Sequence, residues 1–210
     1  MKGMYPRVVK RVLDIFVVLL LSPVWLLLMI ILGLIVKTTS MGPVFFKQKR
    51  AGIHNSYFNM LKFRTMRVDT PKDTPTHLLA NPEQYITGVG RFLRKSSFDE
   101  IPQVLNIIVG HMSIIGPRPA LWNQYDLIEE REKYGANDIR PGLSGWAQVN
   151  GRDELPIDVK ARYDGEYCKD ISFRFDLKIL SLSISAVFKS KGVVEGGPVE
   201  TGNESDGADL

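Results

Sequence analysis

Residues 15–36 read IFVVLLLSPVWLLLMIILGLIV, and this stretch contains no charged side chain. A helix rises about 1.5 Å per residue, so a run of this length can cover a bilayer core of about 30 Å. A cleaved signal peptide usually has a shorter apolar run of about 7–15 residues before a small-residue cleavage site. Here the run ends in Lys37-Thr38-Thr39-Ser40. The sequence therefore predicts a helix that stays inserted in a membrane.

Basic residues stand on both sides of this run: Lys2, Arg7, Lys10 and Arg11 before it, and Lys37, Lys47, Lys49 and Arg50 after it. Positively charged flanks favour the cytoplasmic side, so both ends favour the same face. Ser22-Pro23 lies near the middle, where Pro23 has no N–H for the carbonyl of Leu19 and Ser22 can bond back to Val18. A bend there would return the chain to its starting face. A straight spanning helix is the alternative, because spanning helices tolerate proline.

Length and composition indicate one basic domain, with 210 residues of which 44% are hydrophobic. The net charge is +4, although the tail after Lys191 holds five acidic residues and no Lys or Arg. A basic body suits anionic lipid, phosphate-rich substrates or nucleic acid. Nucleic acid is disfavoured, because the basic residues are spread along the chain without a reading motif. The single cysteine, Cys168, excludes an internal disulfide, and no Cys/His cluster has zinc-ligand spacing.

The remaining elements follow from local patterns. Residues 44–46 and 57–63 are aromatic, β-favouring runs around a turn-like segment, which predicts a β-hairpin. Three prolines in 68–82 predict a loop, and apolar positions three or four apart predict helices over 98–109, 122–134 and 157–167. In residues 173–191 an apolar stripe predicts an amphipathic helix at the membrane surface, or one packed on the protein core. The stripe consists of Leu177, Leu180, Ile184 and Val187.

The chemistry is expected at two adjacent carboxylates, Asp99 and Glu100, which follow three basic residues within 91–95. Positive surroundings keep at least one carboxylate ionised and nucleophilic at neutral pH. The alternative is structural, since Ser97-Phe98-Asp99-Glu100 also fits the S-x-x-E capping box, in which side chains only satisfy backbone donors.

Other strings offer cations for phosphate. Gly116-Pro117-Arg118-Pro119 places an arginine between two prolines, which restrict the backbone around it. Such an arginine suits a bidentate contact to phosphate, and the same string also fits an ordinary rigid turn. In Lys62-Phe63-Arg64-Thr65-Met66, strand alternation would place Lys62 and Arg64 on one face. Residues 140–152, RPGLSGWAQVNGR, combine terminal arginines with several glycines. Glycines let backbone N–H groups approach a phosphate closely, although they are also common in ordinary loops.

Taken together and in this order, the strings resemble the monotopic phosphoglycosyl transferases, the bacterial sugar transferase family. The resemblance runs from about residue 10 to 179 and rests on KRVLD, the Ser22-Pro23 break, KFRTM, RKSSFDEIPQ, MSIIGPRP and RPGLSGWAQVNGR. One departure is SSFDE, where TSLDE is commoner; it leaves the carboxylate pair intact. The likeness is to the small members, which transfer the first sugar in glycan assembly.

The resemblance implies a fold and a reaction. The fold is α/β, mostly α, with a re-entrant membrane helix broken at Ser22-Pro23 in residues 1–40 and a cytoplasmic catalytic domain with interfacial helices in 41–191. Separately, the Gly-rich, acidic composition of residues 192–210 predicts a disordered tail. The reaction transfers a sugar 1-phosphate from a UDP-sugar to undecaprenyl phosphate and releases UMP, with Asp99 as the covalent nucleophile. An N-acetylated hexosamine is the expected sugar.

The resemblance also assigns residues, partners and a location. Glu100, with Asp99, is expected to hold Mg²⁺ or to manage the acceptor proton. Phosphate binding is expected from Arg118, Arg94, Arg152, Lys62 and Arg64. The expected location is the cytoplasmic face of the bacterial inner membrane, with the bilayer and downstream membrane glycosyltransferases as partners. Two alternatives are a glycosyltransferase, for which the usual D-x-D triplet is missing from the sequence, and a membrane-anchored basic binding protein without catalysis.

Overall fold

The structure is a computed structural model that describes residues 4–70, 81–151 and 155–189. It is mostly helical, with two small two-stranded sheets in the described part. The helices are α1 (Lys10–Leu20), α2 (Ser22–Thr39), α3 (Gly88–Lys95), α4 (Gln103–Ile108), α5 (Tyr125–Glu132), α6 (Trp146–Val149), α7 (Ile157–Lys169) and α8 (Phe173–Lys189). The strands are β1 (Phe45–Ala51), β2 (Tyr57–Phe63), β3 (Ser113–Ile115) and β4 (Gly142–Ser144).

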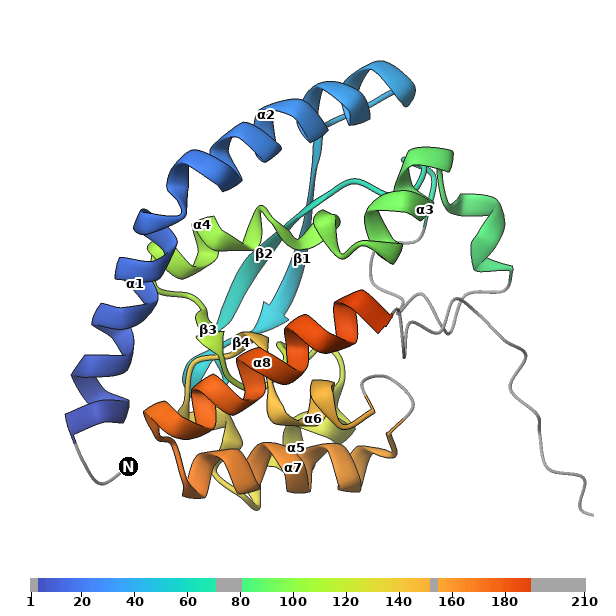
Figure 1. The fold of residues 1–210 in the computed structure, drawn as a ribbon. Helices are drawn as coiled ribbons and strands as arrows, with labels where there is room; N and C mark the ends of the chain where they lie inside the picture. Colours follow the sequence, from blue (N-terminus) through green and yellow to red (C-terminus); the bar gives the residue numbers. More distant parts are fainter. Residues whose placement is uncertain (1–3, 71–80, 152–154, 190–210) are drawn as a thin grey trace, which may run out of the picture.

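The predicted break in the apolar run lies at Leu21, between α1 and α2. Pro23 enters α2 at its first turn, where a missing N–H is tolerated. The indole Nε1 of Trp25 donates to the carbonyl of Val18 at 2.8 Å, which is the acceptor that the sequence assigned to Ser22. Figure 1 shows the two helices as an arch along one side of the molecule.

The predicted β-hairpin is confirmed. β1 and β2 pair antiparallel with Phe45 opposite Phe63 and Phe46 opposite Lys62. The connecting turn contains a short 3₁₀ helix, Ile53–Asn55, with two residues in the left-handed region. The hairpin runs beneath α2, so its side chains can pack on the inner face of the arch (Figure 1).

Two apolar clusters join the arch to the hairpin. In one, Leu32 and Val36 of α2 pack with Phe63 of β2 and Leu93 of α3. In the other, Val18 of α1 packs with residues of β2 and α4 and with the segment after it: Phe58, Met60, Ile107 and Met112. The inner face of the apolar run is therefore part of the protein core.

The start of the chain is bonded to α8, from which it is far apart in the sequence. Tyr5 Oη and Lys10 Nζ both donate to Oδ2 of Asp176 in α8, each at 2.7 Å. Tyr167 Oη of α7 donates to the other oxygen of Asp176 at 2.6 Å. Asp14, which is buried in α1, accepts a 2.6 Å bond from the hydroxyl of Ser113 in β3. The start of the arch is thus tied to the globular body.

The second half of the chain forms a helical layer around the parallel pair β3–β4. α5 to α8 gather at the end of the molecule farthest from α2 (Figure 1). The predicted helices over 122–134, 157–167 and 173–191 correspond to α5, α7 and α8 within a few residues. The predicted helix over 98–109 is divided into a 3₁₀ turn, Phe98–Glu100, and α4. The prolines of the predicted loop over 68–82, and the acidic tail, lie largely outside the described residues.

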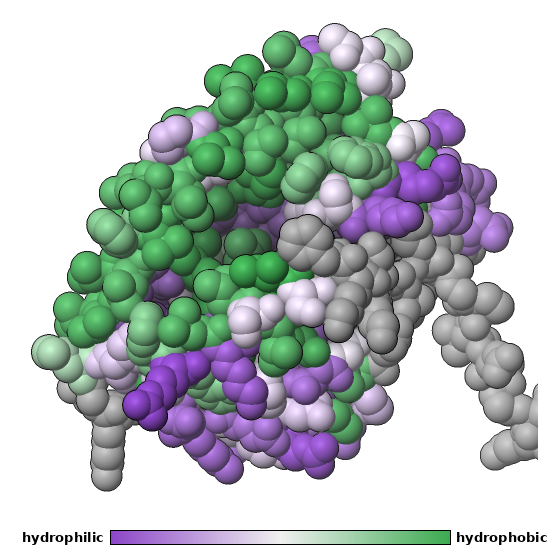
Figure 2. All heavy atoms as spheres, in the orientation of Figure 1, coloured by the Kyte–Doolittle hydropathy of each residue, from purple (hydrophilic) through white to green (hydrophobic). Residues whose placement is uncertain are grey.

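The outer face of the arch is apolar and exposed (Figure 2). Among the helices of the described residues, α2 alone is long and apolar enough to cross a membrane, judged by length and composition, and little of it is buried. On α8, the predicted stripe residues Leu177, Leu180 and Ile184 are also exposed, whereas Ile179 faces the core. The alternative in which this stripe packs on the protein is therefore wrong for these three residues. The side chain of Val187 lies outside the described part.

Candidate active site

The two candidate carboxylates lie in the 3₁₀ turn Phe98–Glu100, directly after α3. Ser97 precedes the turn with φ at 58°, a left-handed conformation that costs a residue with a side chain roughly 1–3 kcal/mol. Its hydroxyl makes no capping bond at this turn, so the capping-box interpretation is wrong. Asp99 is buried at 7% exposure, and the Glu100 side chain points to cations.

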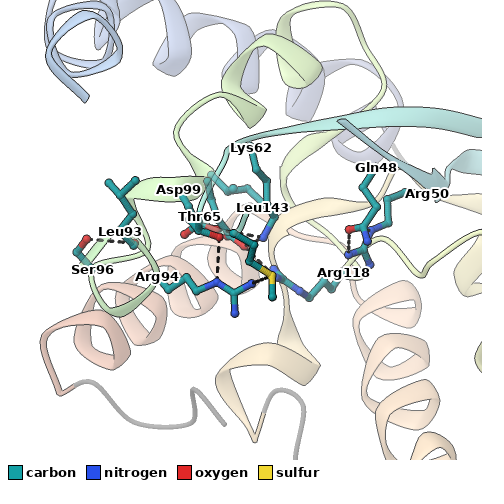
Figure 3. Close-up of polar contacts among 12 residues, drawn as sticks. Gln48, Arg50, Lys62, Thr65, Leu93, Arg94, Ser96, Asp99, Arg118 and Leu143 are labelled. Carbon is teal, nitrogen blue, oxygen red and sulfur yellow. Dashed lines mark hydrogen bonds and ion pairs between the residues drawn. The ribbon is translucent and has the colours of Figure 1, made fainter. Parts of the chain in front are cut away.

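Lys62 reaches the pair from β2. Its Nζ lies 2.7 Å from Glu100 Oε1 and 3.5 Å from Asp99 Oδ2. Lys62 is the penultimate residue of β2 and lies opposite Phe46 in the hairpin. The end of the hairpin therefore places this cation beside the turn that carries the carboxylates (Figure 3).

Two arginines complete the described cluster. Arg118 Nη2 donates to Glu100 Oε1 at 2.8 Å, and a third of its side chain is exposed. Arg94, on the last turn of α3, donates from Nε to Thr65 Oγ1 at 3.0 Å and from Nη2 to Met66 Sδ at 3.1 Å. Thr65 and Met66 of the KFRTM string therefore position a cation from another element (Figure 3).

The two carboxylates have opposite pKa shifts. Burial by itself would raise the pKa of Glu100, but Arg118 and Lys62 outweigh burial and hold that pKa far below its ordinary value. Burial raises the pKa of Asp99; Lys62, Arg94 and Arg118 work against this rise, and the charge of Glu100 adds to it. Glu100 is thus the fixed anion of the pair, and Asp99 is the carboxylate whose burial the cations offset less fully.

Two predicted phosphate ligands are not placed in this cluster. Arg64 Nη2 donates to the carbonyl and hydroxyl oxygens of Ser40, at the end of α2. Lys62 and Arg64, which strand alternation would place on one face, thus have different partners. Arg64 follows the last residue of β2, and its N–H still donates to the carbonyl of Val44 at 2.9 Å. Arg152 lies outside the described residues.

The sequence matches the family described as bacterial sugar transferase over residues 5–190, almost the whole chain. The chain belongs to the bacterial sugar transferase family. It is therefore an enzyme, a transferase, and the alternative of a binding protein without catalysis is set aside. This membership agrees with the resemblance drawn from the KFRTM, SSFDE and GPRP strings.

Three proteins similar to this sugar transferase illustrate how widely the likeness extends. It is 37% identical to the sugar transferase EpsL of Bacillus subtilis, over 89% of this chain and 90% of EpsL. It is 35% identical to the exopolysaccharide production protein ExoY of Sinorhizobium fredii, over 87% of each chain. It is 38% identical to a UDP-glucose:undecaprenyl-phosphate glucose-1-phosphate transferase of Xanthomonas campestris pv. campestris, over 89% of this chain but 40% of that protein.

Sequence reasoning about this sugar transferase missed two residues beside the cluster, Gln48 and Arg50 of β1. Gln48 Oε1 accepts from Arg50 Nε at 3.1 Å and from Nη2 at 2.5 Å, and Arg50 Nη1 donates to the carbonyl of Pro119 at 2.9 Å. The available signal was the polar alternation of Gln48 and Arg50 on a strand next to aromatic residues.

A metal site made only of protein ligands is not found among the described residues, where no three His, Cys, Asp or Glu side chains gather. The donor set of this sugar transferase does fit Mg²⁺ shared with a substrate, because Mg²⁺ is commonly held by one or two carboxylates together with phosphate oxygens and water. Asp99 and Glu100 provide such oxygens within one turn, and Oδ1 of Asp99 accepts no bond from the described part of the chain.

Proposed function

We propose that this sugar transferase moves a sugar 1-phosphate from a UDP-sugar to undecaprenyl phosphate, through a covalent phosphoglycosyl-aspartate on Asp99. The observation that carries the proposal is a buried carboxylate beside a second, cation-paired carboxylate, with Lys62, Arg94 and Arg118 around them. Two phosphate-bearing substrates must approach a carboxylate nucleophile, and fixed cations offset their repulsion. Relatives named for undecaprenyl phosphate support the acceptor.

In the first step, an oxygen of ionised Asp99 attacks the β-phosphorus of the UDP-sugar. The bond from this phosphorus to the bridging oxygen breaks, and UMP leaves with the electron pair. Arg118 is the cation best placed to meet the diphosphate, because it is partly exposed while bonded to Glu100. Arg94, held by Thr65 and Met66, approaches Asp99 from α3.

In the second step, a phosphate oxygen of undecaprenyl phosphate attacks the same phosphorus. The Asp99 oxygen–phosphorus bond breaks, which restores the carboxylate and yields undecaprenyl diphospho-sugar. Glu100 keeps Lys62 and Arg118 in place throughout, since its bonds to both survive the change at Asp99. Each step is a phosphoryl transfer in which positioning and charge supply most of the rate.

Mg²⁺ belongs to the proposal, with Asp99 and Glu100 as its protein ligands; when bound it supplies charge neutralisation for the diphosphate. Chelation with EDTA should reduce UMP release, and added Mg²⁺ should restore it without a change in the thermal unfolding midpoint. Full activity after exhaustive chelation would contradict this assignment.

The sugar carried by the UDP donor is either glucose or an N-acetylated hexosamine. Relatives named for UDP-glucose favour glucose, whereas the sequence resemblance led us to expect an N-acetylated hexosamine. Parallel assays of UMP release from UDP-glucose, UDP-N-acetylglucosamine and UDP-N-acetylgalactosamine decide between them. Release of UDP instead of UMP would point to glycosidic transfer and overturn the proposed reaction.

Membrane placement follows from the apolar arch. α1 and α2 expose apolar side chains outward, and both ends of the arch are bonded to one body, through Asp176 at the start and Ser40 at the end. A helix whose two ends meet the same globular body returns to one face of a bilayer. We place the catalytic cluster on the cytoplasmic face of the inner membrane, where the soluble donor and the lipid acceptor can both arrive.

The covalent step is tested by intact-protein mass after incubation with UDP-sugar and no acceptor. The parent should gain the mass of one phospho-sugar, and Asp99→Asn should gain none. Asp138→Asn is the matched control, because Asp138 is an exposed aspartate whose Oδ1 lies 3.1 Å from Nδ1 of the exposed His54. An equal adduct on Asp99→Asn would remove Asp99 from its role.

Topology is tested by thiol labelling at Met4→Cys and Lys133→Cys, two exposed positions at the start and in the catalytic part. Cys168 should give little background, since burial raises the pKa of its thiol to about 12. A re-entrant arch predicts that an impermeant reagent labels both positions from the cytoplasmic side only. Labelling of the two positions from opposite sides would mean that the chain crosses.

A further inference from the structure

The carbonyl groups on both sides of Arg118 are held by hydrogen bonds. The carbonyl of Pro117 accepts from the backbone N–H of Gly142 at 2.8 Å. The carbonyl of Pro119 accepts from Nη1 of Arg50 at 2.9 Å. The first bond is made between backbones, whereas the second depends on one side chain from a strand far away in the sequence.

Arg50 is held in an orientation that suits this contact. Gln48 Oε1 accepts from both Nε and Nη2 of Arg50, so the edge of the guanidinium away from Pro119 is fixed (Figure 3). The backbone extends the same junction, because Ala51 N–H donates to the carbonyl of Ala120 at 2.9 Å and Arg50 bridges to Leu121. The planar guanidinium of Arg50 is hydrogen-bonded to Gln48 on one edge and to Pro119 on the other, and it thereby connects β1 to residues 119–121. We call this pair, Arg50 and Gln48, the brace.

The brace lies on the catalytic side of the hairpin. Residues opposite each other in an antiparallel pair point to one face, and Phe46 is opposite Lys62. Gln48 and Arg50 therefore share the Lys62 face. Lys49 points to the other face, where its Nζ lies 4.4 Å from the centroid of Tyr57 and 4.9 Å from that of Trp122.

We propose that Arg50, oriented by Gln48, is a positioning residue that acts through Arg118. It fixes the backbone that carries Arg118, and so fixes the guanidinium that bonds Glu100 at 2.8 Å and meets the donor diphosphate. Arg50 itself does not bind substrate in this assignment, because each of its three guanidinium nitrogens already donates to Gln48 or Pro119. The kinetic part of this inference rests on the proposed function.

A double-mutant cycle tests whether Arg50 acts through Arg118. Arg50→Met should lower kcat/KM for UMP release by about 10- to 100-fold, the loss expected when a catalytic group is displaced by about 1 Å. In an Arg118→Ala background the same change should cost less than about twofold, since the residue it positions is already gone. Equal losses in both backgrounds would overturn the inference.

Two further variants separate positioning from general stability. Gln48→Leu should give a smaller loss of the same kind, because it frees the Arg50 guanidinium without removing it. Lys49→Met is the matched control: it removes a neighbouring cation from the opposite face and should leave kcat/KM within about twofold. A loss for Lys49→Met as large as that for Arg50→Met would mean that the hairpin as a whole, and not the brace, is responsible.

Amide hydrogen exchange provides a readout that does not depend on the reaction. Exchange at residues 118, 120 and 121 should accelerate several-fold in Arg50→Met and stay at the parent rate in Lys49→Met. Unchanged exchange in Arg50→Met would overturn the brace even if the enzyme turns over as proposed. If the parent released no UMP from any UDP-sugar, the proposed function would fail, and the exchange data would still decide whether Arg50 holds this segment.

Discussion

Arg64 Nη2 donates to both oxygens of Ser40, at 2.8 Å to the carbonyl and 2.7 Å to the hydroxyl. Ser40 is the C-cap residue directly after α2, so the guanidinium binds at the C-terminal end of the apolar helix. The side chain of Arg64 is 5% exposed, and its Nε and Nη1 find no acceptor in the described structure. This buried cation links the end of the arch to the strand that carries Lys62.

Arg64→Ala should destabilise the protein without a large effect on donor binding. The change leaves a cavity and removes two hydrogen bonds from Ser40, a combined cost of about 2–4 kcal/mol. A lower thermal unfolding midpoint with an unchanged KM for UDP-sugar is the expected result. Arg67→Ala is the control, because the Arg67–Asp69 pair is exposed and should contribute less than about 1 kcal/mol. A raised KM at an unchanged midpoint would instead restore Arg64 as a phosphate ligand.

Gly42→Ala tests the turn that covers this guanidinium. Gly42 has φ at 116°, and a Cβ there would come within 2.0 Å of Arg64 Nη1. We expect a loss of about 1–3 kcal/mol in the free energy of unfolding, from backbone strain and displacement of Arg64. Gly88→Ala is the matched control at the start of α3, where a Cβ meets nothing within 4 Å and helix propensity favours alanine. Similar unfolding midpoints for the two variants would show that the turn adapts freely.

Arg64 and Lys62 show what a local pattern can and cannot predict. The KFRTM string correctly indicated a charged segment of functional interest, and Lys62 does reach the carboxylates. Alternation did not predict the partner of Arg64, because Arg64 lies just past the last residue of β2 and its guanidinium reaches Ser40 at the end of α2. Strand ends depend on which element covers them, and that contact joins residues far apart in the sequence.

The catalytic cluster was predictable only in part for the same reason. Asp99, Glu100 and Arg118 stand in strings that carry the resemblance to the family, and the resemblance indicates phosphate chemistry there. Arg50 and Gln48 carry no such signal, because their role depends on the carbonyl of Pro119, sixty-nine residues away from Arg50. The capping-box alternative at Ser97 fitted the sequence equally well, and it failed because Glu100 bonds to Lys62 and Arg118 instead.

The pKa of Asp99 should set the acidic limb of the pH profile. Asp99 must be ionised to attack, and burial raises its pKa above the ordinary value of about 4. The rate of the first step is measured as UMP release in a single turnover. It should fall as the pH drops through the raised pKa of Asp99, above the ordinary value of about 4. The charge of Glu100 contributes to the raised pKa, so Glu100→Gln should move the limb to lower pH, whatever its effect on the maximum rate.

Lys62→Met provides the opposite arm of this experiment. Lys62 lowers the pKa of Asp99, so its removal should move the acidic limb to higher pH. Shifts of Glu100→Gln and Lys62→Met in the same direction would contradict the assignment of the limb to Asp99. A profile that both changes leave in place would mean that another group titrates.

Trp25→Phe tests the break in the apolar run. The indole donates to the carbonyl of Val18, a buried residue whose side chain packs in the apolar cluster. Phenylalanine keeps most of the ring and removes the donor, so the carbonyl loses its partner at a cost of about 1–3 kcal/mol.

Trp146→Phe is the control: it removes an indole bond to Glu166 at an exposed site, where water can replace the donor. Thermal unfolding of both variants in one detergent should show the larger loss for Trp25→Phe, with faster amide exchange at residues 21–25. Equal losses would mean that the carbonyl of Val18 is satisfied in another way and that the indole does not stabilise the bend.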